Sequence, residues 1–421
     1  MRTTGSLRPE PLDPTDREAV TAFRHAADRT FLQTLGTPEE IATLSRLMAG
    51  DRLSRILDGG RTVATFRSFD TDLTLPGGSA LPVNAVSAVT VAATHRRRGI
   101  LTTMMRADLA AARDRGVAVS ALFAAEAGIY ARFGFGPATR SAPLTLASPR
   151  VRFREDAPVG GTVELHEPGE VGAELRAVQE RTRRGRAGGL SRSRAWWQHT
   201  TRPGGFPAAT RVVLHRDEDG EPDGYALSEG IPAWDHEVSN ARMVVPQLLA
   251  ATPEAYCGIL ETLASTDLVR SVELADRPLD DPLPWLLVDE RAVTSGPVRD
   301  ALWLRVLDAP AALSARSWWG TGEAVVEVVD ETPEAFAAGT LRIAVEESGR
   351  DAEGWARAEV TPTTADPDVR LGADALAALL LGGSDVMTLA AAGRAGGTRS
   401  GLRRAALLFG TDREPWCDTH F

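Results

Sequence analysis

The sequence predicts an α+β protein with more than one domain. Its 421 residues exceed what a single hydrophobic core usually holds, so two or three domains are expected. Strand-like and helix-like segments alternate through the first two thirds of the chain. In the last third the strands come first, from about Ala301, and helical segments follow at 372–381 and 401–409. Strands followed by helices are typical of an α+β layer.

Proline and glycine clusters indicate where the domains meet. Ser148-Pro-Arg and the nearby Ala157-Pro-Val-Gly-Gly favour a first boundary, and Asp281-Pro-Leu-Pro favours a second. The predicted domains are 1–150, 151–300 and 301–421. Within them we expect a helix over 38–57, a strand at 141–146 that closes the first domain, and a strand at 301–307 that opens the third.

A strand, a glycine turn and a helix follow one another in Val-Thr-Val-Ala-Ala-Thr-His-Arg-Arg-Arg-Gly-Ile-Leu, which begins at Val89. The first N–H groups of a helix have no intrahelical partner, and the helix dipole adds positive potential there. Gly99 lets the backbone approach an anion, and Arg96, Arg97 and Arg98 add charge. The turn therefore predicts a phosphate-binding site, although most charged turns of this kind bind nothing.

The residues after this turn continue the pattern. Apolar residues recur at spacings of three and four, which predicts a helix with one buried face: Ile100, Leu101, Met104, Met105, Leu109 and Ala112. Gly116 ends this helix, and the apolar run 117–123 is typical of a buried strand.

This stretch resembles the acetyl-CoA core of the GNAT acyltransferase superfamily, whose motif Arg/Gln-x-x-Gly-x-Gly/Ala is matched by Arg96 and Gly99. Leu101 replaces the second small residue of the motif. One branch shares that departure, the Eis (enhanced intracellular survival) aminoglycoside acetyltransferases. Ala-Glu-Ala-Gly-Ile-Tyr-Ala-Arg-Phe-Gly-Phe-Gly, which begins at Ala125, and the terminal Trp-Cys-Asp-Thr-His-Phe also resemble that branch.

The resemblance implies two tandem GNAT-like domains, the second without a cofactor site, followed by a sterol-carrier-like α/β domain. It also implies a homo-hexamer with acetyl-CoA as co-substrate. Backbone groups at Ala125 are expected to serve in place of a serine of the relatives. The residues that the resemblance assigns to acetyl-CoA are Val89, Thr90, Val91, Arg96, Arg97, Arg98, Gly99, Ile100, Leu101, Thr102, Ala125 and Glu126.

The same resemblance implies two catalytic residues. Tyr130 is the expected general acid, which protonates the departing thiolate. A phenol with a pKa near 10 holds its proton more tightly than a thiol with a pKa near 8.5. The site must therefore lower the phenol pKa or share the proton in the transition state. The α-carboxylate of Phe421 is the expected base or proton relay, but the preceding His420 titrates near neutrality and is an alternative base.

Two residues are weaker candidates for contact with the acceptor substrate. Asp28 lies on the expected first helix, where this superfamily usually binds its substrate, and His420 stands where relatives carry an acidic residue. For Asp28 a solvated helix face is the simpler interpretation. For the C-terminus the simpler interpretation is a frayed end, although Trp416 and Phe421 favour docking.

Composition excludes several classes of partner. The formal charge of −10 at pH 7 disfavours nucleic acid and anionic membranes. No apolar run approaches membrane-spanning length, and the N-terminus lacks the apolar segment of a secretory signal. Only Cys257 and Cys417 are present, so we expect a cytoplasmic protein without a disulfide framework. The scattered histidines and cysteines predict no metal site.

The leading hypothesis is an acetyl-CoA-dependent N-acetyltransferase that acts directly, in a ternary complex, on amines of polycationic small molecules such as aminoglycosides. Transfer of another acyl group, or transfer to a protein lysine, stays open, because the turn at Gly99 indicates only that CoA is bound. A non-enzymatic carrier of an apolar ligand is the alternative from a different class.

Overall fold

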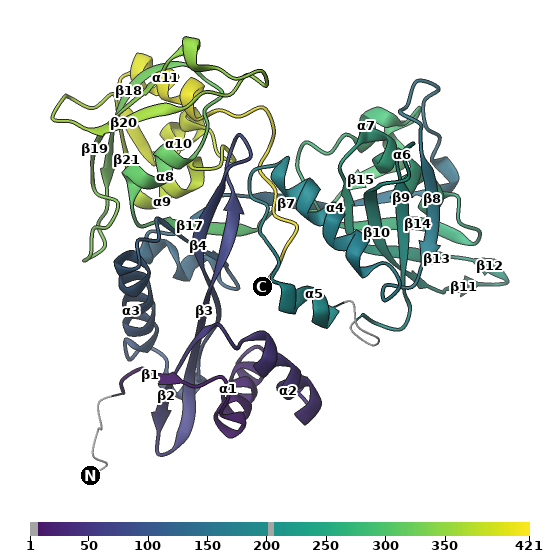
Figure 1. The fold of residues 1–421 in the computed structure, drawn as a ribbon, viewed down its shortest axis with the longest axis horizontal. Helices are drawn as coiled ribbons and strands as arrows, with labels where there is room; N and C mark the ends of the chain where they lie inside the picture. The colour runs from purple at the N-terminus through teal and green to yellow at the C-terminus, as the bar shows by residue number, and fades with distance from the viewer. Residues whose placement is uncertain (1–6, 201–205) are drawn as a thin grey trace.

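The computed structural model describes residues 7–200 and 206–421, and it divides into three lobes (Figure 1). The chain builds most of the first lobe and then the second, returns to the first sheet with one strand, and continues into the third lobe. The C-terminal segment then runs back between the first two lobes. Helices and sheets are mixed in every lobe, which confirms the α+β prediction. Among the described helices none is long and apolar enough to cross a bilayer.

The first lobe is a mixed sheet with helices on both faces. Its strand order is β1-β2-β3-β4-β5-β17-β6, in which β4 and β5 are parallel neighbours. The strands are β1 (Glu10–Leu12), β2 (Arg52–Asp58), β3 (Arg61–Thr74), β4 (Ala80–Val91), β5 (Val119–Phe123), β6 (Gly136–Pro137) and β17 (Leu302–Val306), and the helices are α1 (Arg17–Thr30), α2 (Pro38–Leu47) and α3 (Ile100–Asp114).

The second lobe repeats this plan. Its strand order is β15-β7-β14-β13-β10-β9-β8, with β13 and β14 parallel. The strands are β7 (Arg140–Ala147), β8 (Thr162–His166), β9 (Thr210–Arg216), β10 (Pro222–Ile231), β13 (Ala241–Ala250), β14 (Val269–Arg277) and β15 (Val293–Ser295). The helices are α4 (Gly172–Arg184), α5 (Arg194–Thr200), α6 (Pro253–Ala264) and α7 (Leu283–Leu286). The short strand β16 (Arg299–Asp300) also pairs with β7, and β11 (Trp234–Asp235) pairs with β12 (Val238–Ser239).

The third lobe packs helices on one sheet of order β20-β19-β18-β21-β22. The strands are β18 (Gly322–Val329), β19 (Gly339–Val345), β20 (Ala358–Pro362), β21 (Val369–Gly372) and β22 (Ala395–Gly397), and the helices are α8 (Ala309–Ala315), α9 (Ala373–Leu379), α10 (Val386–Ala391) and α11 (Arg399–Phe409). Its interior holds Trp318, Arg316 and Phe409, none more than 2% exposed. Arg316 has carbonyl acceptors at Leu380 (2.9 Å) and Leu379 (3.3 Å), and burial lowers its pKa to about 9.

Strands cross the predicted boundaries between the lobes. The segment 141–146 was expected to close the first domain, but β7 pairs with β14 and β15 of the second sheet. The segment 301–307 was expected to open the third domain, but β17 lies in the first sheet, between β5 and β6. Both expectations were wrong, because an apolar strand sequence does not identify its partner. The division at 150 and 300 remains a prediction.

The predicted helix over 38–57 is also too long. It begins at a capping box in which the Thr37 hydroxyl accepts from the Glu40 N–H and the Glu40 carboxylate accepts from the Thr37 N–H. It ends at Leu47, and β2 follows from Arg52. Leu53 and Ile56 are buried in that strand at a spacing of three, which imitates a helical face in the sequence.

Gly136 offers a test of how closely the first and third lobes pack. A Cβ atom at this position would lie 1.9 Å from the Asp374 carbonyl oxygen in α9. We expect Gly136→Ala to lower the free energy of unfolding by about 1–3 kcal/mol, because either β6 or α9 must shift. Chemical denaturation measures this. Gly128→Ala is the matched control, since a Cβ there has no neighbour within 4 Å; equal losses for both variants would contradict the prediction.

Candidate active site

An opening between β4 and β5 is the main feature of the first sheet. The two strands pair only from Asn84↔Ser120 to Val86↔Leu122, although β4 continues to Val91. On its other side β4 stays paired with β3 to its end. Within the described residues, the backbone of β4 beyond Val86 therefore has no strand partner on the side of β5. Such N–H and C=O groups need other partners, and a ligand can supply them.

A β-bulge shapes this end of β4. The pairing with β3 shifts at Ala88 and Val89, and Ala88 has a φ of +48°. The Thr65 hydroxyl donates to the Ala88 carbonyl at 2.7 Å and lies 2.5 Å from the Thr90 hydroxyl. Because a bulge bends and twists a strand, it directs the end of β4 away from β5. The buried threonine pair fixes that geometry.

The predicted glycine turn follows this strand and leads into α3. Gly99 is the N-cap residue with a φ of +78°, and a Cβ placed there would meet nothing within 4 Å. The first helical bond runs from the Thr103 N–H to the Gly99 carbonyl at 2.9 Å. The N–H groups of Ile100, Leu101 and Thr102 find no acceptor among the described residues. The turn thus presents free donors to open space, as an anion site requires.

The arginines of the turn surround this space. Arg96, Arg97 and Arg98 are exposed, and Arg97 has a φ of +62°. The Arg96 guanidinium lies 3.8 Å from the carboxylate of Glu126, which follows β5. This exposed ion pair bridges the two sides of the opening. Of the other predicted cofactor residues, Ala125 is exposed, Val89, Val91, Leu101 and Thr102 are half-buried, and Thr90 and Ile100 are buried.

Tyr130 packs in the same apolar cluster as α3 and follows β5 in the chain. Its side chain is 7% exposed, belongs to the apolar cluster with Met104 and Met105, and meets the Phe135 ring edge-on at 6.2 Å. Its hydroxyl has no hydrogen-bond partner among the described residues and is not among the fully buried polar atoms. The hydroxyl therefore keeps contact with solvent, although the ring is buried.

Burial raises the pKa of the Tyr130 phenol above its usual value of 10.0, and the negative charge of Glu126 adds to this effect. A lowered phenol pKa, one of the two ways expected to aid proton transfer, is therefore not found. The hydroxyl stays protonated at neutral pH. Of the two expected ways to aid proton transfer, only sharing of the proton between the phenol and the thiolate in the transition state is left.

The C-terminus docks against the first sheet rather than fraying. The Phe421 ring packs edge-on against Phe69 at 5.3 Å and Phe123 at 5.2 Å, residues of β3 and β5. The His420 ring lies 4.4 Å from the Phe123 ring, and its Nε2 is 3.4 Å from Asp276 Oδ2. The hydrogen bond with His420 holds the pKa of Asp276 below its usual range. The last two residues thus reach the end of β5 that borders the opening.

Asp28 has a different setting from the one predicted. Its carboxylate is 1% exposed, lies 2.6 Å from Arg24 Nε and accepts the Gly36 N–H at 3.0 Å. Because both oxygens are engaged, this side chain fixes the loop between α1 and α2 and does not face solvent. Asp276, Phe69 and Phe123 were not predicted. No local signal identifies them, since each is brought to the C-terminus by the fold.

Among residues 7–200 and 206–421, no three side chains of His, Cys, Asp or Glu are grouped so that they could hold a metal ion. The pair His215 and Asp223 lies in the second lobe at 2.6 Å, and both are buried. The opening brings together main-chain amides, the arginines of the turn, Glu126, the Tyr130 phenol and the C-terminus with His420.

Family models match the chain in the order of its lobes. An acetyltransferase (GNAT) domain matches residues 12–138, a second acetyltransferase (GNAT) domain matches 188–306, and a sterol carrier protein domain matches 309–418. The predicted succession of domain types is thereby confirmed. The second match ends within β17, which the fold assigns to the first sheet.

Curated relatives align over nearly the whole chain. An uncharacterized N-acetyltransferase of Streptomyces avermitilis is 38% identical over 98% of this chain and all of its own length. The N-acetyltransferase Eis of Mycobacterium tuberculosis is 34% identical over 95% of this chain and 96% of its own.

Solved structures show the same arrangement. Eis1 of Mycobacterium abscessus superimposes with a TM-score of 0.79 at 29% identity, covering 98% of this chain and 99% of its own. A GCN5-related N-acetyltransferase from Anabaena variabilis shares the fold with a TM-score of 0.80 at 18% identity, covering 98% of this chain and 100% of its own.

Proposed function

Because this chain belongs to the Eis-like branch of the GNAT N-acetyltransferases, we propose that it transfers the acetyl group of acetyl-CoA to an amine of a polycationic small molecule such as an aminoglycoside. The family implies an acyl-CoA co-substrate. The observation that carries the proposal is the opening between β4 and β5, which is bordered by the free amides of α3, by Tyr130 and by the C-terminus.

Acetyl-CoA is the co-substrate in this proposal. The amides and arginines from Arg96 to Thr102 bind its pyrophosphate, and the unpaired backbone of Val89 to Val91 bonds the pantetheine. Backbone groups at Ala125 and Glu126, which follow β5, contact the coenzyme from the opposite side of the opening. A main-chain N–H of β4 then polarises the thioester carbonyl, since donors fixed in place stabilise the charge that develops on that oxygen.

The reaction is a direct transfer. The neutral amine attacks the thioester carbon, the tetrahedral intermediate collapses, and the carbon–sulfur bond breaks as the sulfur takes the Tyr130 proton. The proton released by the amine passes through water to the Phe421 carboxylate, and solvent reprotonates the phenolate. His420 bonded to Asp276 is the alternative acceptor of that proton.

The acidic groups near the C-terminus support a cationic acceptor. The Glu126 and Asp276 side chains are 64% and 45% exposed, and the low pKa of Asp276 keeps it ionised. The terminal carboxylate of Phe421 adds a third negative charge. His420 offsets part of it when protonated. Asp28 contributes indirectly in this proposal, by holding the loop between α1 and α2.

A non-enzymatic carrier is set aside, because the chain is a GNAT N-acetyltransferase and the interior of its third lobe is filled by Trp318, Arg316 and Phe409. The homo-hexamer and the cytoplasmic location remain predictions.

Thiol release tests the proposal. Purified protein, acetyl-CoA and 4,4′-dithiodipyridine are mixed with an aminoglycoside, spermine or a lysine peptide. We expect turnover with the aminoglycoside to exceed turnover with the peptide by about tenfold or more. The protein's own thiols add little background, because Cys257 and Cys417 are buried and burial raises the pKa of Cys257 to about 11. Faster release with the peptide would redirect the proposal to protein lysines.

The pH dependence follows from the raised pKa of Tyr130. A raised pKa favours the protonated form, so the acid keeps its proton through the neutral and mildly alkaline range and is lost only as the pH rises through a pKa above 10. We expect kcat to rise as the amine loses its proton and then to stay level up to about pH 9.5. Rates are measured from pH 6 to 10 with subtraction of thioester hydrolysis. A decline centred between pH 8 and 9 that is absent in Tyr130→Phe would contradict this.

A tag at the C-terminus should inactivate the enzyme. It converts the Phe421 carboxylate into an amide and adds residues where the ring packs on Phe69 and Phe123. We expect kcat to fall by about 100-fold, within the range of an acid–base group, with little change in acetyl-CoA affinity. The control is the same tag at the N-terminus. Equal rates for the two proteins would remove the terminal carboxylate from the mechanism.

A further inference from the structure

The C-terminal segment after α11 has neither helix nor strand, yet from Glu414 to Asp418 it is bound to the second lobe. The Arg186 Nε donates to the Glu414 carbonyl at 2.8 Å, and the Trp416 N–H donates to the Ala187 carbonyl at 2.8 Å. The Trp416 indole donates to the Asp276 carbonyl at 2.5 Å. In Figure 1 this segment descends between the two lobes and ends beside α5.

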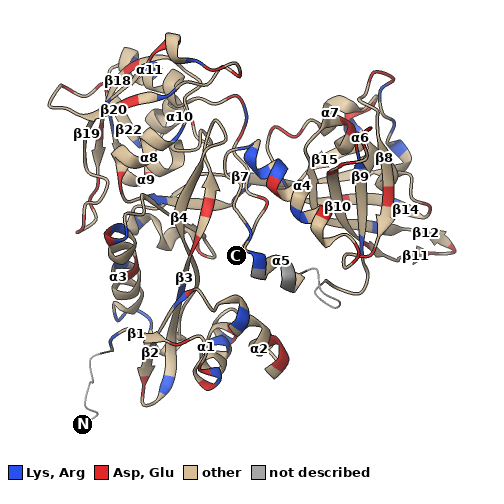
Figure 2. Ribbon diagram, in the orientation of Figure 1, with Lys and Arg blue, Asp and Glu red and all other residues tan. Residues whose placement is uncertain are grey.

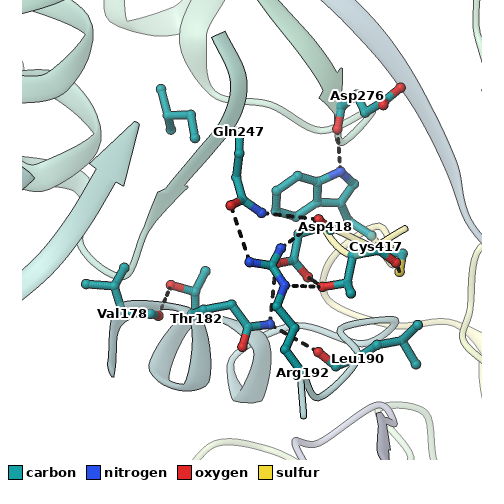
Figure 3. Close-up of polar contacts among 12 residues, drawn as sticks. Val178, Thr182, Leu190, Arg192, Gln247, Asp276, Cys417 and Asp418 are labelled. Atoms are coloured by element: carbon teal, nitrogen blue, oxygen red, sulfur yellow. Dashed lines mark hydrogen bonds and ion pairs between the residues drawn. The ribbon is translucent and has the colours of Figure 1, made fainter. Parts of the chain in front are cut away.

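One contact of this segment is a buried ion pair. The Arg192 guanidinium lies 3.2 Å from the Asp418 carboxylate, and the two side chains are 3% and 5% exposed (Figure 3). The same guanidinium donates to the Thr419 hydroxyl at 3.0 Å, to the Asp418 carbonyl at 3.1 Å and to Gln247 Oε1 at 3.3 Å. Gln247 also accepts the Tyr225 hydroxyl at 2.8 Å. All three nitrogens of the guanidinium thus donate hydrogen bonds.

Arg192 is itself held by the first sheet. The chain just before it runs beside β3, where the Thr74 N–H donates to the Gly189 carbonyl at 2.8 Å and the Ser191 N–H donates to the Asp72 carbonyl at 2.9 Å. Figure 2 shows the basic start of α5 beside the C-terminus. Arg192 therefore joins three segments that are distant in sequence: β3, β13 and the C-terminal segment.

The second lobe has an opening like that of the first, and the C-terminal segment lines the cavity of about 360 Å³ that lies there. β13 and β14 pair only as far as Val245↔Leu274, although β13 continues to Ala250. Arg277 Nη1 donates to the Leu248 carbonyl inside this gap at 2.6 Å, and its Nε donates to Asp281 at 2.8 Å. The Trp416 ring lies 5.1 Å from that guanidinium. The edge of β13 that lacks a strand partner thus lies beside the C-terminal segment, whereas the matching edge of β4 in the first sheet is the one proposed to bind acetyl-CoA.

We propose that the second acetyltransferase-like lobe acts as a clamp for the C-terminal segment, and that Arg192 and Asp418 are positioning residues which fix the terminal carboxylate at the opening of the first sheet. Phe421 is three residues beyond Asp418, so the ion pair restricts it to a radius of roughly 11 Å. A buried ion pair is weak evidence for stability, but loss of one partner leaves an uncompensated charge. The role in catalysis rests on the function proposed above.

Substitution of the pair tests the clamp by two independent readouts. We expect Asp418→Asn and Arg192→Gln to lower kcat at least about tenfold while the acetyl-CoA affinity from calorimetry stays within about twofold. Arg192→Lys, which keeps the charge but fewer bonds, should lose less. We also expect carboxypeptidase A to remove Phe421 from the two charge-loss variants faster than from the unchanged protein, as followed by intact mass.

Asp330→Asn is the matched control. Asp330 pairs with Arg305 at 2.6 Å, and those side chains are 0% and 1% exposed, so the variant also strands a buried arginine. The hydrogen bonds of this pair go to Thr332 and Ala337 and not to the C-terminal segment. It should resist carboxypeptidase as the unchanged protein does. If Asp418→Asn does not fold, Thr419→Val is the second variant. It removes the bond that the Thr419 hydroxyl accepts from Arg192 Nε and the bond that it donates to Asp418 Oδ1, but it keeps the ion pair, so it should give a smaller change of the same kind.

The clamp is overturned if the charge-loss variants keep both their kcat and their resistance to carboxypeptidase. Released termini with unchanged kcat would overturn the link to catalysis. If the unchanged protein transfers no acetyl group to any amine, the proposed function fails, while the difference in carboxypeptidase release still decides whether the second lobe holds the terminus.

Discussion

Replacing Tyr130 with phenylalanine should lower kcat by about 10²- to 10⁴-fold, the range expected for loss of a general acid. The affinity for acetyl-CoA should stay within about twofold, because the predicted contacts to the coenzyme come from β4 and the turn at Gly99. Single-turnover rates with saturating acetyl-CoA measure the chemical step, and calorimetry measures the affinity.

The structure indicates that Tyr130→Phe removes the hydroxyl and leaves the surrounding packing unchanged. The Tyr130 ring fills an apolar cluster with Met104 and Met105 and contacts the Phe135 ring, and phenylalanine preserves that packing. Its hydroxyl has no hydrogen-bond partner among the described residues, so its loss strands no buried group. Thermal unfolding should therefore be unchanged. A kcat equal to that of the unchanged protein would show that the thiolate leaves without this acid.

Local patterns in the sequence predicted the glycine turn and the helix at the opening well. The apolar spacing from Ile100 and the stop at Gly116 gave a helix that the structure places at Ile100–Asp114. The Gly99 turn has the left-handed backbone that glycine favours, and its free amides lie at the helix start. These features depend on residues within a few positions of one another, and short-range preferences decide them.

The partners of strands could not be predicted in the same way. β7 and β17 have the alternation or apolar run of ordinary strands, but each pairs across a predicted boundary. A strand's sequence reports burial and period, whereas its neighbour depends on where distant segments pack. The prediction that the helix continues to residue 57 was wrong for a related reason. A strand can also bury residues three apart, as Leu53 and Ile56 show.

The arrangement around the C-terminus depends on contacts that no local signal reveals. The terminal Trp-Cys-Asp-Thr-His-Phe suggested docking, and Phe421 does pack on Phe69 and Phe123. The residue that holds this segment, Arg192, precedes Asp418 by 226 positions. Asp28 illustrates the opposite case, because a side chain on the expected helix face turned out to bond its own loop.

Replacing Gly99 with alanine should weaken acetyl-CoA binding by about 100-fold, equivalent to about 2.7 kcal/mol. Gly99 has a φ of +78°, and its missing Cβ points into open space where the pyrophosphate is proposed to bind. A methyl group there keeps the phosphates from the free amides of Ile100 to Thr102, and each bond to a charged group is worth about 1.5–3 kcal/mol. Calorimetric titration with acetyl-CoA gives the dissociation constant.

The other end of the same helix supplies the control that separates binding from backbone strain. Gly116 has a φ of +79° and, like Gly99, no atom within 4 Å of a placed Cβ. Alanine therefore strains both positions by about the same amount, and both variants should lose about 1 kcal/mol of stability. Only Gly99→Ala should lose acetyl-CoA affinity. Equal affinities for the two variants would mean that the coenzyme is not held by the start of α3, and the proposed acetyl transfer at this opening would lose its physical basis.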